Sequence, residues 1–140
     1  MKAKELMLFD LVKRKKDGKV MTVVELRYAE TIAAITPNDV YYGDMEDYHE
    51  SEIEPIPLTP EILKKNGFTN CETTELTGEM GNELWYPGED NYISDPDLMI
   101  NFGKRSFLVR FACSIVWRLH YVHELQHFLR LVDYDKEIVL

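Results

Sequence analysis

The chain has 140 residues, is 45% hydrophobic and carries a formal net charge of −9. A chain of this length can bury one core or two small ones, and it needs no disulfide or metal to fold. The negative charge repels polyanions, which argues against broad binding of nucleic acids. No apolar run approaches the roughly 18 residues of a membrane-spanning helix, so no membrane partner is expected.

The cysteine content agrees with an intracellular setting. Cys71 and Cys113 lie far apart in the sequence and form no C-x-x-C pair, so neither a zinc ribbon nor a dithiol redox site is indicated. The first residues contain no apolar stretch of signal-peptide length. These features predict a protein of the reducing cytoplasm that uses no cofactor.

The chain begins with a predicted hairpin. Strands are expected at 11–15 and 20–26, on either side of Asp17-Gly18. This dipeptide tolerates the positive φ angles of a two-residue hairpin turn, so we expect the two strands to pair directly across it.

Three further strands are predicted before residue 59. Two are expected at 31–35 and 40–42, and the acidic segment from Asp44 to Glu54 is expected to form a solvated loop. The segment 53–58 contains two prolines, which lack an amide donor, so it suits only an edge strand. Five short strands of this kind predict a small SH3-like β-barrel over residues 1–58.

A short helix is predicted at 59–66. Thr59 is a favourable N-cap, Pro60 occupies the first helical position without losing a hydrogen bond, and Glu61 suits the positive end of the helix dipole. Asn66-Gly67 is a typical helix end. The acidic segment 68–97 that follows is rich in turn formers, and its Trp85-Tyr86 pair is a candidate binding anchor.

The last third predicts a β-meander that leads into a helix. Strands are expected at 98–102, 107–111 and 115–119, although a helical apolar stripe through the same residues leaves one long helix as an alternative. A short edge strand is expected at 136–140. Residues 59–140 are therefore predicted to form an α+β part that ends in an amphipathic helix.

The most specific chemical pattern is His123-Glu124-Leu125-Gln126-His127, which matches the H-E-x-x-H sequence of zinc peptidases. Residues four apart share one face of an α-helix, so His123 and His127 would bind one cation while Glu124 acts as general base. A catalytic zinc also needs a third protein ligand. The available donors are Asp133, Asp135 and Glu137 downstream and His120 one turn upstream.

A solvated helix face is the competing interpretation, and we favour it. The apolar residues follow the spacing of a core-facing stripe, which comprises Tyr121, Val122, Leu125, Phe128, Leu129 and Val132. The opposite side carries His120, His123, Gln126, His127 and Arg130. Arg130 would also place a fixed positive charge near a cation on His127. The pattern therefore predicts a polar interaction surface and no bound metal, with Trp85, Tyr86, His120, His123 and His127 as its candidate residues.

A run of basic residues lies near the start of the chain, whereas the middle of the chain is acidic. The basic run contains Lys13, Arg14, Lys15, Lys16 and Lys19. Charged residues at the edge and turn of a hairpin also discourage unwanted strand pairing, and we interpret the run in this way.

Three segments resemble a known family when they are taken together. They are the opening from Lys4 to Val12, the block from Ile53 to Phe68 with its I-E-P-I-P-L-T-P-E-I-L sequence, and the ending from Tyr121 to Gln126. The chain resembles small uncharacterised proteins encoded by prophages and mobile elements of anaerobic gut bacteria. The resemblance implies an origin, but it implies no activity and no catalytic residues.

The sequence as a whole predicts a non-enzymatic accessory protein that binds another protein. The alternative is a small zinc-dependent hydrolase with His123, His127 and Asp133 as ligands and Glu124 as base. A third possibility is a nucleic-acid adaptor that contacts phosphates through residues 13–19.

Overall fold

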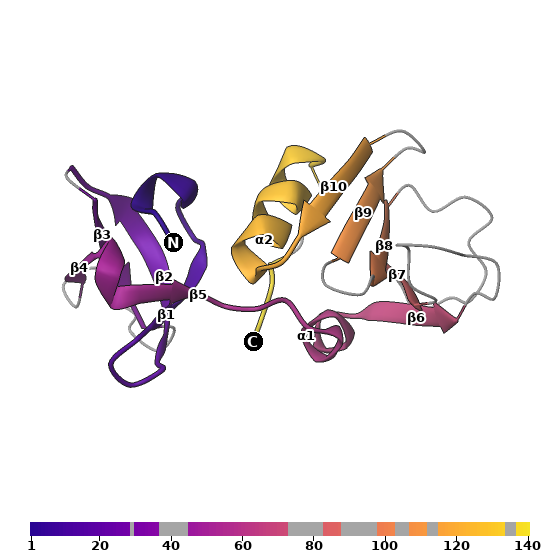
Figure 1. Cartoon of the computed structure of the whole chain (residues 1–140), viewed down its shortest axis with the longest axis horizontal. Coiled ribbons are helices and arrows are strands. Elements are labelled where there is room, and N and C mark those ends of the chain that lie inside the picture. Colours follow the sequence, from indigo (N-terminus) through magenta and orange to yellow (C-terminus); the bar gives the residue numbers. More distant parts are fainter. Residues whose placement is uncertain are drawn as a thin grey trace. The chain divides into compact units, whose positions relative to one another are not determined.

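The computed structural model describes residues 1–28, 30–36, 45–72, 83–87, 98–102, 107–111, 115–133 and 137–140. These residues form both strands and helices, so the chain is an α+β protein, as the sequence predicts (Figure 1). The chain divides into two compact units, one made of 1–56 with 121–135 and the other of 57–120 with 136–140. The sequence placed everything after residue 58 in one part, whereas the structure assigns 121–135 to the first unit.

The first unit contains one antiparallel five-stranded sheet. Its strands are β1 (Leu11–Arg14), β2 (Val20–Leu26), β3 (Thr31–Ile35), β4 (Glu46–His49) and β5 (Ile53–Pro55), in the order β4-β3-β2-β1-β5. The last strand returns to pair with the first, so that Lys13 lies opposite Glu54. The sheet is not closed, and β4 and β5 are its two edges. The predicted positions of β1, β2 and β3 are confirmed, and the predicted strand at 40–42 lies outside the described residues.

Strand β4 corrects the predicted acidic loop. Tyr48 is buried in the core and lies opposite Ile32 of β3, whereas its neighbours Asp47 and His49 are exposed. Side chains alternate between the two faces of a strand. One buried aromatic residue whose charged neighbours point to solvent therefore suits a short edge strand.

The β1–β2 turn is longer than the predicted two-residue turn. The N–H of Arg14 donates to the carbonyl of Lys19 at 2.8 Å, and the N–H of Gly18 donates to the carbonyl of Arg14 at 2.8 Å. Residues 15–18 therefore form the loop, and Gly18 supplies its positive φ angle of 71°.

The core of the first unit draws on every strand of its sheet. Its apolar cluster comprises Ala3, Leu6, Val12, Met21, Val23, Ile32, Ala34, Tyr48 and Ile53. Helix α2 (Val122–Leu131) belongs to the same unit and contacts β1. Its predicted apolar residues Val122, Leu125, Phe128 and Leu129 are buried. Among the described residues, no helix is long and apolar enough to cross a membrane.

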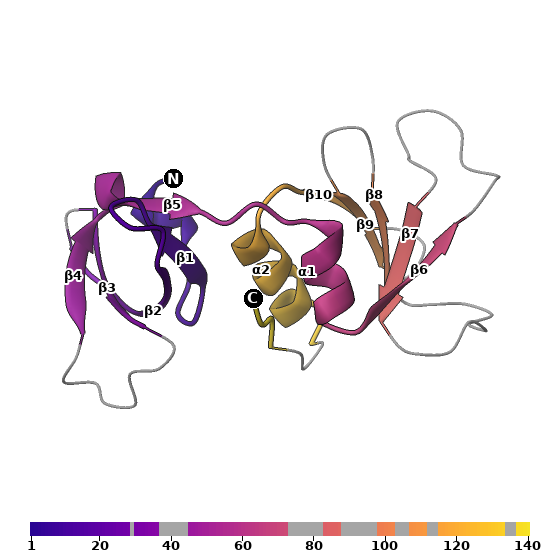
Figure 2. The ribbon, with the colours of Figure 1, turned by 90° about the horizontal axis from the view of Figure 1, so that it is seen from below.

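The second unit contains helix α1 and a second antiparallel sheet. Helix α1 spans Pro60–Lys65, and the strands are β6 (Phe68–Glu72), β7 (Glu83–Pro87), β8 (Leu98–Phe102), β9 (Phe107–Phe111) and β10 (Ile115–Leu119). The sheet order is β10-β9-β8-β7-β6, so each strand pairs with its sequence neighbours (Figure 2). The predicted meander at 98–119 is confirmed, and the alternative of one long helix is wrong because α2 begins at Val122. Strands β6 and β7 were not anticipated within the turn-rich segment.

The end of the chain is not the predicted edge strand. Residues 137–140 adopt no regular structure, and the side chain of Asn66 holds their backbone instead. The N–H of Val139 donates to Asn66 Oδ1 at 2.8 Å, and Asn66 Nδ2 donates to the carbonyl of Val139 at 2.8 Å. An amide side chain thus replaces the strand partner, and Ile138 is buried beside it.

Candidate functional site

The first turn of α2 is fixed by the acidic residue of the H-E-x-x-H sequence. Glu124 Oε2 accepts a hydrogen bond from the N–H of Tyr121, the residue before the helix, at 3.0 Å. A carboxylate at this position pairs a helix-end donor and interacts favourably with the helix dipole. The group that a zinc peptidase would use as general base therefore caps the helix.

His127 contacts a buried carboxylate from the start of the chain. Its Nε2 lies 2.6 Å from Oδ2 of Asp10, and Nη1 of Arg130 lies 2.9 Å from Oδ1 of the same residue. Asp10 has no exposed surface. The carboxylate also accepts the N–H of Met7 at 2.7 Å. Nε2 of His127 is thus engaged by the carboxyl group of Asp10 and is not free to bind a metal.

Gln126 joins α2 to the backbone that precedes β1. Its Oε1 accepts the N–H of Leu11 at 3.0 Å, and its Nε2 donates to the carbonyl of Phe9 at 3.1 Å. The side chain is buried. One amide side chain therefore satisfies a donor and an acceptor of the main chain, as a neighbouring strand would do.

His123 is the least satisfied member of this helix face. It is 5% exposed, and among the described residues its Nδ1 has no hydrogen-bond partner. Its ring lies 5.7 Å from that of His127 in an edge-on arrangement, and it stacks on Tyr121. Burial lowers the pKa of His123, and the negative charges of Asp10 and Glu124 act in the opposite direction.

The polar face of α2 is therefore not the solvated surface that its sequence predicted. His123 and Gln126 are buried and His127 is half-buried, whereas Arg130 remains exposed although it contacts Asp10. A helical wheel distinguishes the polar face of a helix from its apolar face. It does not show that a segment more than 100 residues earlier supplies hydrogen-bond partners to the polar face.

The residues described by the structure contain no group of three His, Cys, Asp or Glu side chains able to hold a metal ion. His123 and His127 are brought together, but Asp133 is exposed beyond the end of α2, with a φ angle of 54°. Asp135 lies outside the described residues. Glu137 is exposed and belongs to the second unit. Among the described residues of the first unit, His123 and His127 therefore have no third ligand for a zinc site.

The other candidate interaction residues belong to the second unit. Trp85 lies opposite Asn70 within the β6–β7 pair, and Tyr86 lies opposite Thr69. The side chains of this pair are outside the description. His120 follows β10 and is exposed. The candidate interaction residues are therefore divided between the two units.

Sequence reasoning missed the segment that α2 holds. Met7, Leu8 and Phe9 are 49%, 44% and 59% exposed, respectively. Phe9 also has a φ angle of 67°, which is rare for a bulky residue. Three consecutive apolar residues before Asp10 are visible in the sequence, but an apolar run by itself predicts burial.

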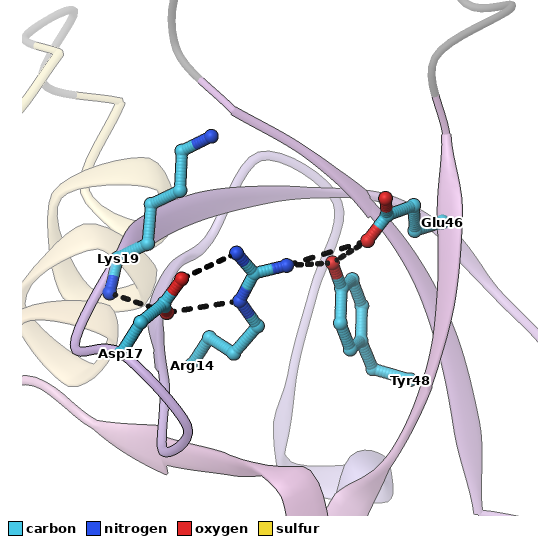
Figure 3. Close-up of polar contacts among 5 residues, drawn as sticks. All are labelled: Arg14, Asp17, Lys19, Glu46 and Tyr48. Atoms are coloured by element: carbon cyan, nitrogen blue, oxygen red, sulfur yellow. Dashed lines mark hydrogen bonds and ion pairs between the residues drawn. The ribbon is translucent and has the colours of Figure 1, made fainter.

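Two residues of the basic run, Lys13 and Arg14, pair with acidic side chains of the first unit. Arg14 forms two contacts with Asp17, Nε to Oδ1 at 2.9 Å and Nη2 to Oδ2 at 2.5 Å, and its Nη1 donates to Tyr48 Oη at 2.8 Å (Figure 3). The hydrogen bonds from Arg14 hold the pKa of Asp17 well below its usual range. Glu46 also contacts Arg14, at 3.3 Å. Lys13 pairs with Glu54 at 3.5 Å. Acidic partners thus compete with any phosphate for these cations.

Comparisons with known proteins give one partial similarity. No family model matches the chain, and no solved structure matches it. The chain is 34% identical over 89 residues to a protein of Invertebrate iridescent virus 6 described as "Probable DNA-directed RNA polymerase II subunit RPB1 homolog". The match covers 64% of this chain but 8% of the viral protein.

Proposed function

We propose that this protein is a non-enzymatic module that binds another protein. The observation that carries the proposal is the use of the H-E-x-x-H helix as a scaffold. Glu124 caps α2, and Gln126 and His127 hold the segment from Phe9 to Leu11. The contact with Tyr121 engages the carboxylate that would activate water, and the contact with Asp10 engages one of the two ring nitrogens of His127.

We also propose that the protein is an accessory protein of a prophage or mobile element. This origin rests on the resemblance of the block from Ile53 to Phe68 and of the ending from Tyr121 to Gln126 to such proteins. The similarity to the viral polymerase homolog spans too little of that protein to add a function.

We propose in addition that the first sheet belongs to a small SH3-like barrel. Its edges β4 and β5 would lie roughly 19 Å apart in a flat five-stranded sheet. The chain passes from His49 at the end of β4 to Ile53 at the start of β5, a distance of at most about 14 Å even when fully extended. This short connection supports a sheet that curls and brings its two edges closer together, as a barrel of this type requires.

The tests of this function are metal content, peptidase activity and partner binding. We expect the purified, untagged chain to contain no stoichiometric zinc and to cleave no peptide. We expect it to bind a protein from its native host that can be purified and titrated against it. One zinc per chain that is lost when His123 and His127 are both replaced by Ala, with peptidase activity lost in Glu124→Gln, would establish the hydrolase instead.

A further inference from the structure

The segment from Met7 to Phe9 presents three large apolar side chains to solvent in succession. Their exposed fractions are 49%, 44% and 59%. Single exposed apolar residues are ordinary on protein surfaces, but a contiguous group is typical of an interaction site. We call Met7, Leu8 and Phe9 the apolar loop.

The backbone of the apolar loop is held at both ends. The N–H of Phe9 donates to the carbonyl of Val23 at 2.7 Å, and its carbonyl accepts Gln126 Nε2 at 3.1 Å. The N–H of Met7 donates to Asp10 Oδ2 at 2.7 Å. Asp10 is itself fixed by His127 and Arg130. A loop held in this way loses little conformational entropy on binding, which favours affinity.

The backbone of Phe9 adopts an unfavourable conformation, and its side chain is exposed. Its φ angle of 67° lies in the left-handed region, where a side chain costs energy that glycine avoids. Strained positions of this kind persist only where the surrounding structure enforces them, and they gather at functional sites. Here, both backbone groups of Phe9 are hydrogen-bonded, so the strain is enforced by β2 and α2.

We propose that the apolar loop inserts into an apolar pocket on a partner protein, with Phe9 as its anchor. This inference rests on the proposed protein-binding function and identifies the surface that would serve it. Aromatic residues at the centre of an interface commonly supply most of its binding energy.

A partner protein fits the loop better than a second copy or a lipid surface. Three half-exposed side chains offer roughly 300 Å² of apolar surface, so symmetric pairing of two loops would bury only about 600 Å² in total, compared with about 1,600 Å² in a standard interface. The net charge of −9 opposes approach to anionic lipid headgroups. The same charge complements a pocket with a basic rim.

The test uses the full chain and begins by identifying the partner. A photoreactive benzophenone amino acid at position 8 captures the contacting protein in the native host, and the captured protein is then purified. Its affinity for the wild-type chain is compared by calorimetry with its affinity for Phe9→Gly, Leu8→Ser and Tyr28→Ser. Glycine adopts the required φ angle, and Tyr28 is a matched control because it is 96% exposed outside the loop.

We expect Phe9→Gly and Leu8→Ser to weaken binding at least tenfold, with Tyr28→Ser unchanged and all melting temperatures within a few degrees of wild type. A partner that binds Phe9→Gly with full affinity would overturn the role of the loop but not the proposed function. The absence of any partner for the wild-type chain would overturn both.

Two further measurements test whether the apolar loop binds a lipid surface or a second copy of the chain instead. Co-sedimentation with vesicles of phosphatidylcholine and phosphatidylglycerol, lost in Phe9→Gly, would assign the loop to lipid. A concentration-dependent dimer in sedimentation velocity, lost in the same variant, would assign it to a second copy. Either result would overturn the proposed protein partner.

Discussion

At the scale of single residues, Phe9 shows most directly that the apolar loop is imposed by its surroundings. Its φ angle is 67°, and its backbone N–H and carbonyl are both bonded to other segments. Any residue placed here must adopt this conformation or break those bonds. The strain can therefore be measured separately from the loss of the aromatic side chain.

We expect Phe9→Gly to be more stable than Phe9→Ala by about 1 kcal/mol, because glycine adopts positive φ angles without steric cost. At an ordinary position, alanine would be the more stable of the two. Urea unfolding of both variants measures the difference. Equal stability, or an advantage for alanine, would show that the backbone at position 9 is not strained.

The burial of His123 predicts that the stability of the first unit depends on pH. Burial lowers its pKa below the ordinary value of 6.5. Below pH 6.5 the unfolded chain binds a proton at this histidine more readily than the folded chain does. The stability present above pH 6.5 is therefore lost as the pH falls toward the lower pKa of the folded state.

We expect the wild-type chain to lose more stability between pH 7.5 and pH 5.5 than the variant His123→Phe. Phenylalanine keeps a ring against Tyr121 and His127 but has no titrating group. The free energy of unfolding in urea at the two pH values provides the comparison. The same pH dependence in both proteins would contradict a role for His123.

At the scale of elements, the second unit is an insertion between β5 and α2. The first unit contains residues 1–56 and 121–135, so the chain leaves it after Ile56 and returns at Tyr121. The N–H of Val122 donates to the carbonyl of Ile56 at 2.9 Å, which places the two ends of the interruption side by side. A short linker is therefore long enough to join them.

We expect a chain in which a short glycine linker replaces residues 57–120, ending at Asp133, to unfold cooperatively. Residues 1–58 alone should be much less stable, because they lose the buried apolar residues of α2 and the partners that it supplies to Asp10. Circular dichroism and thermal unfolding of both chains test this. Equal melting temperatures would show that α2 is dispensable to the first sheet.

At the scale of the whole molecule, charge determines which partners are disfavoured. The net charge is −9, and Lys13 and Arg14 of the basic run already pair with Glu54 and Asp17. Phosphate binding would have to displace these carboxylates. The long-range field of the protein would oppose it as well.

We therefore expect negligible binding to duplex DNA at physiological salt. Fluorescence anisotropy with a labelled duplex measures it. Submicromolar binding that weakens steeply with salt, and that disappears when Lys13, Lys15 and Lys16 are replaced by Glu, would contradict this expectation and support the nucleic-acid adaptor.

Local patterns in the sequence were sufficient to predict many of the elements. The strands at 20–26 and 31–35 follow from β-rich runs bounded by turn signals, and α1 follows from Thr59, Pro60 and the Asn66-Gly67 end. Such signals act within a few residues, so no tertiary information is needed to read them. Strands β6 and β7 were not predicted, because turn formers and acidic residues dominate the sequence around them.

The candidate site was recognised in the sequence, but its role was not. The sequence by itself determined that α2 is amphipathic and that His123, Gln126 and His127 share its polar side. Only the tertiary structure decided that this side is buried, because Asp10, Phe9 and Leu11 supply the partners for it. Side-chain chemistry sets which groups must be satisfied, whereas the folded chain sets which group satisfies them and which apolar residues stay exposed.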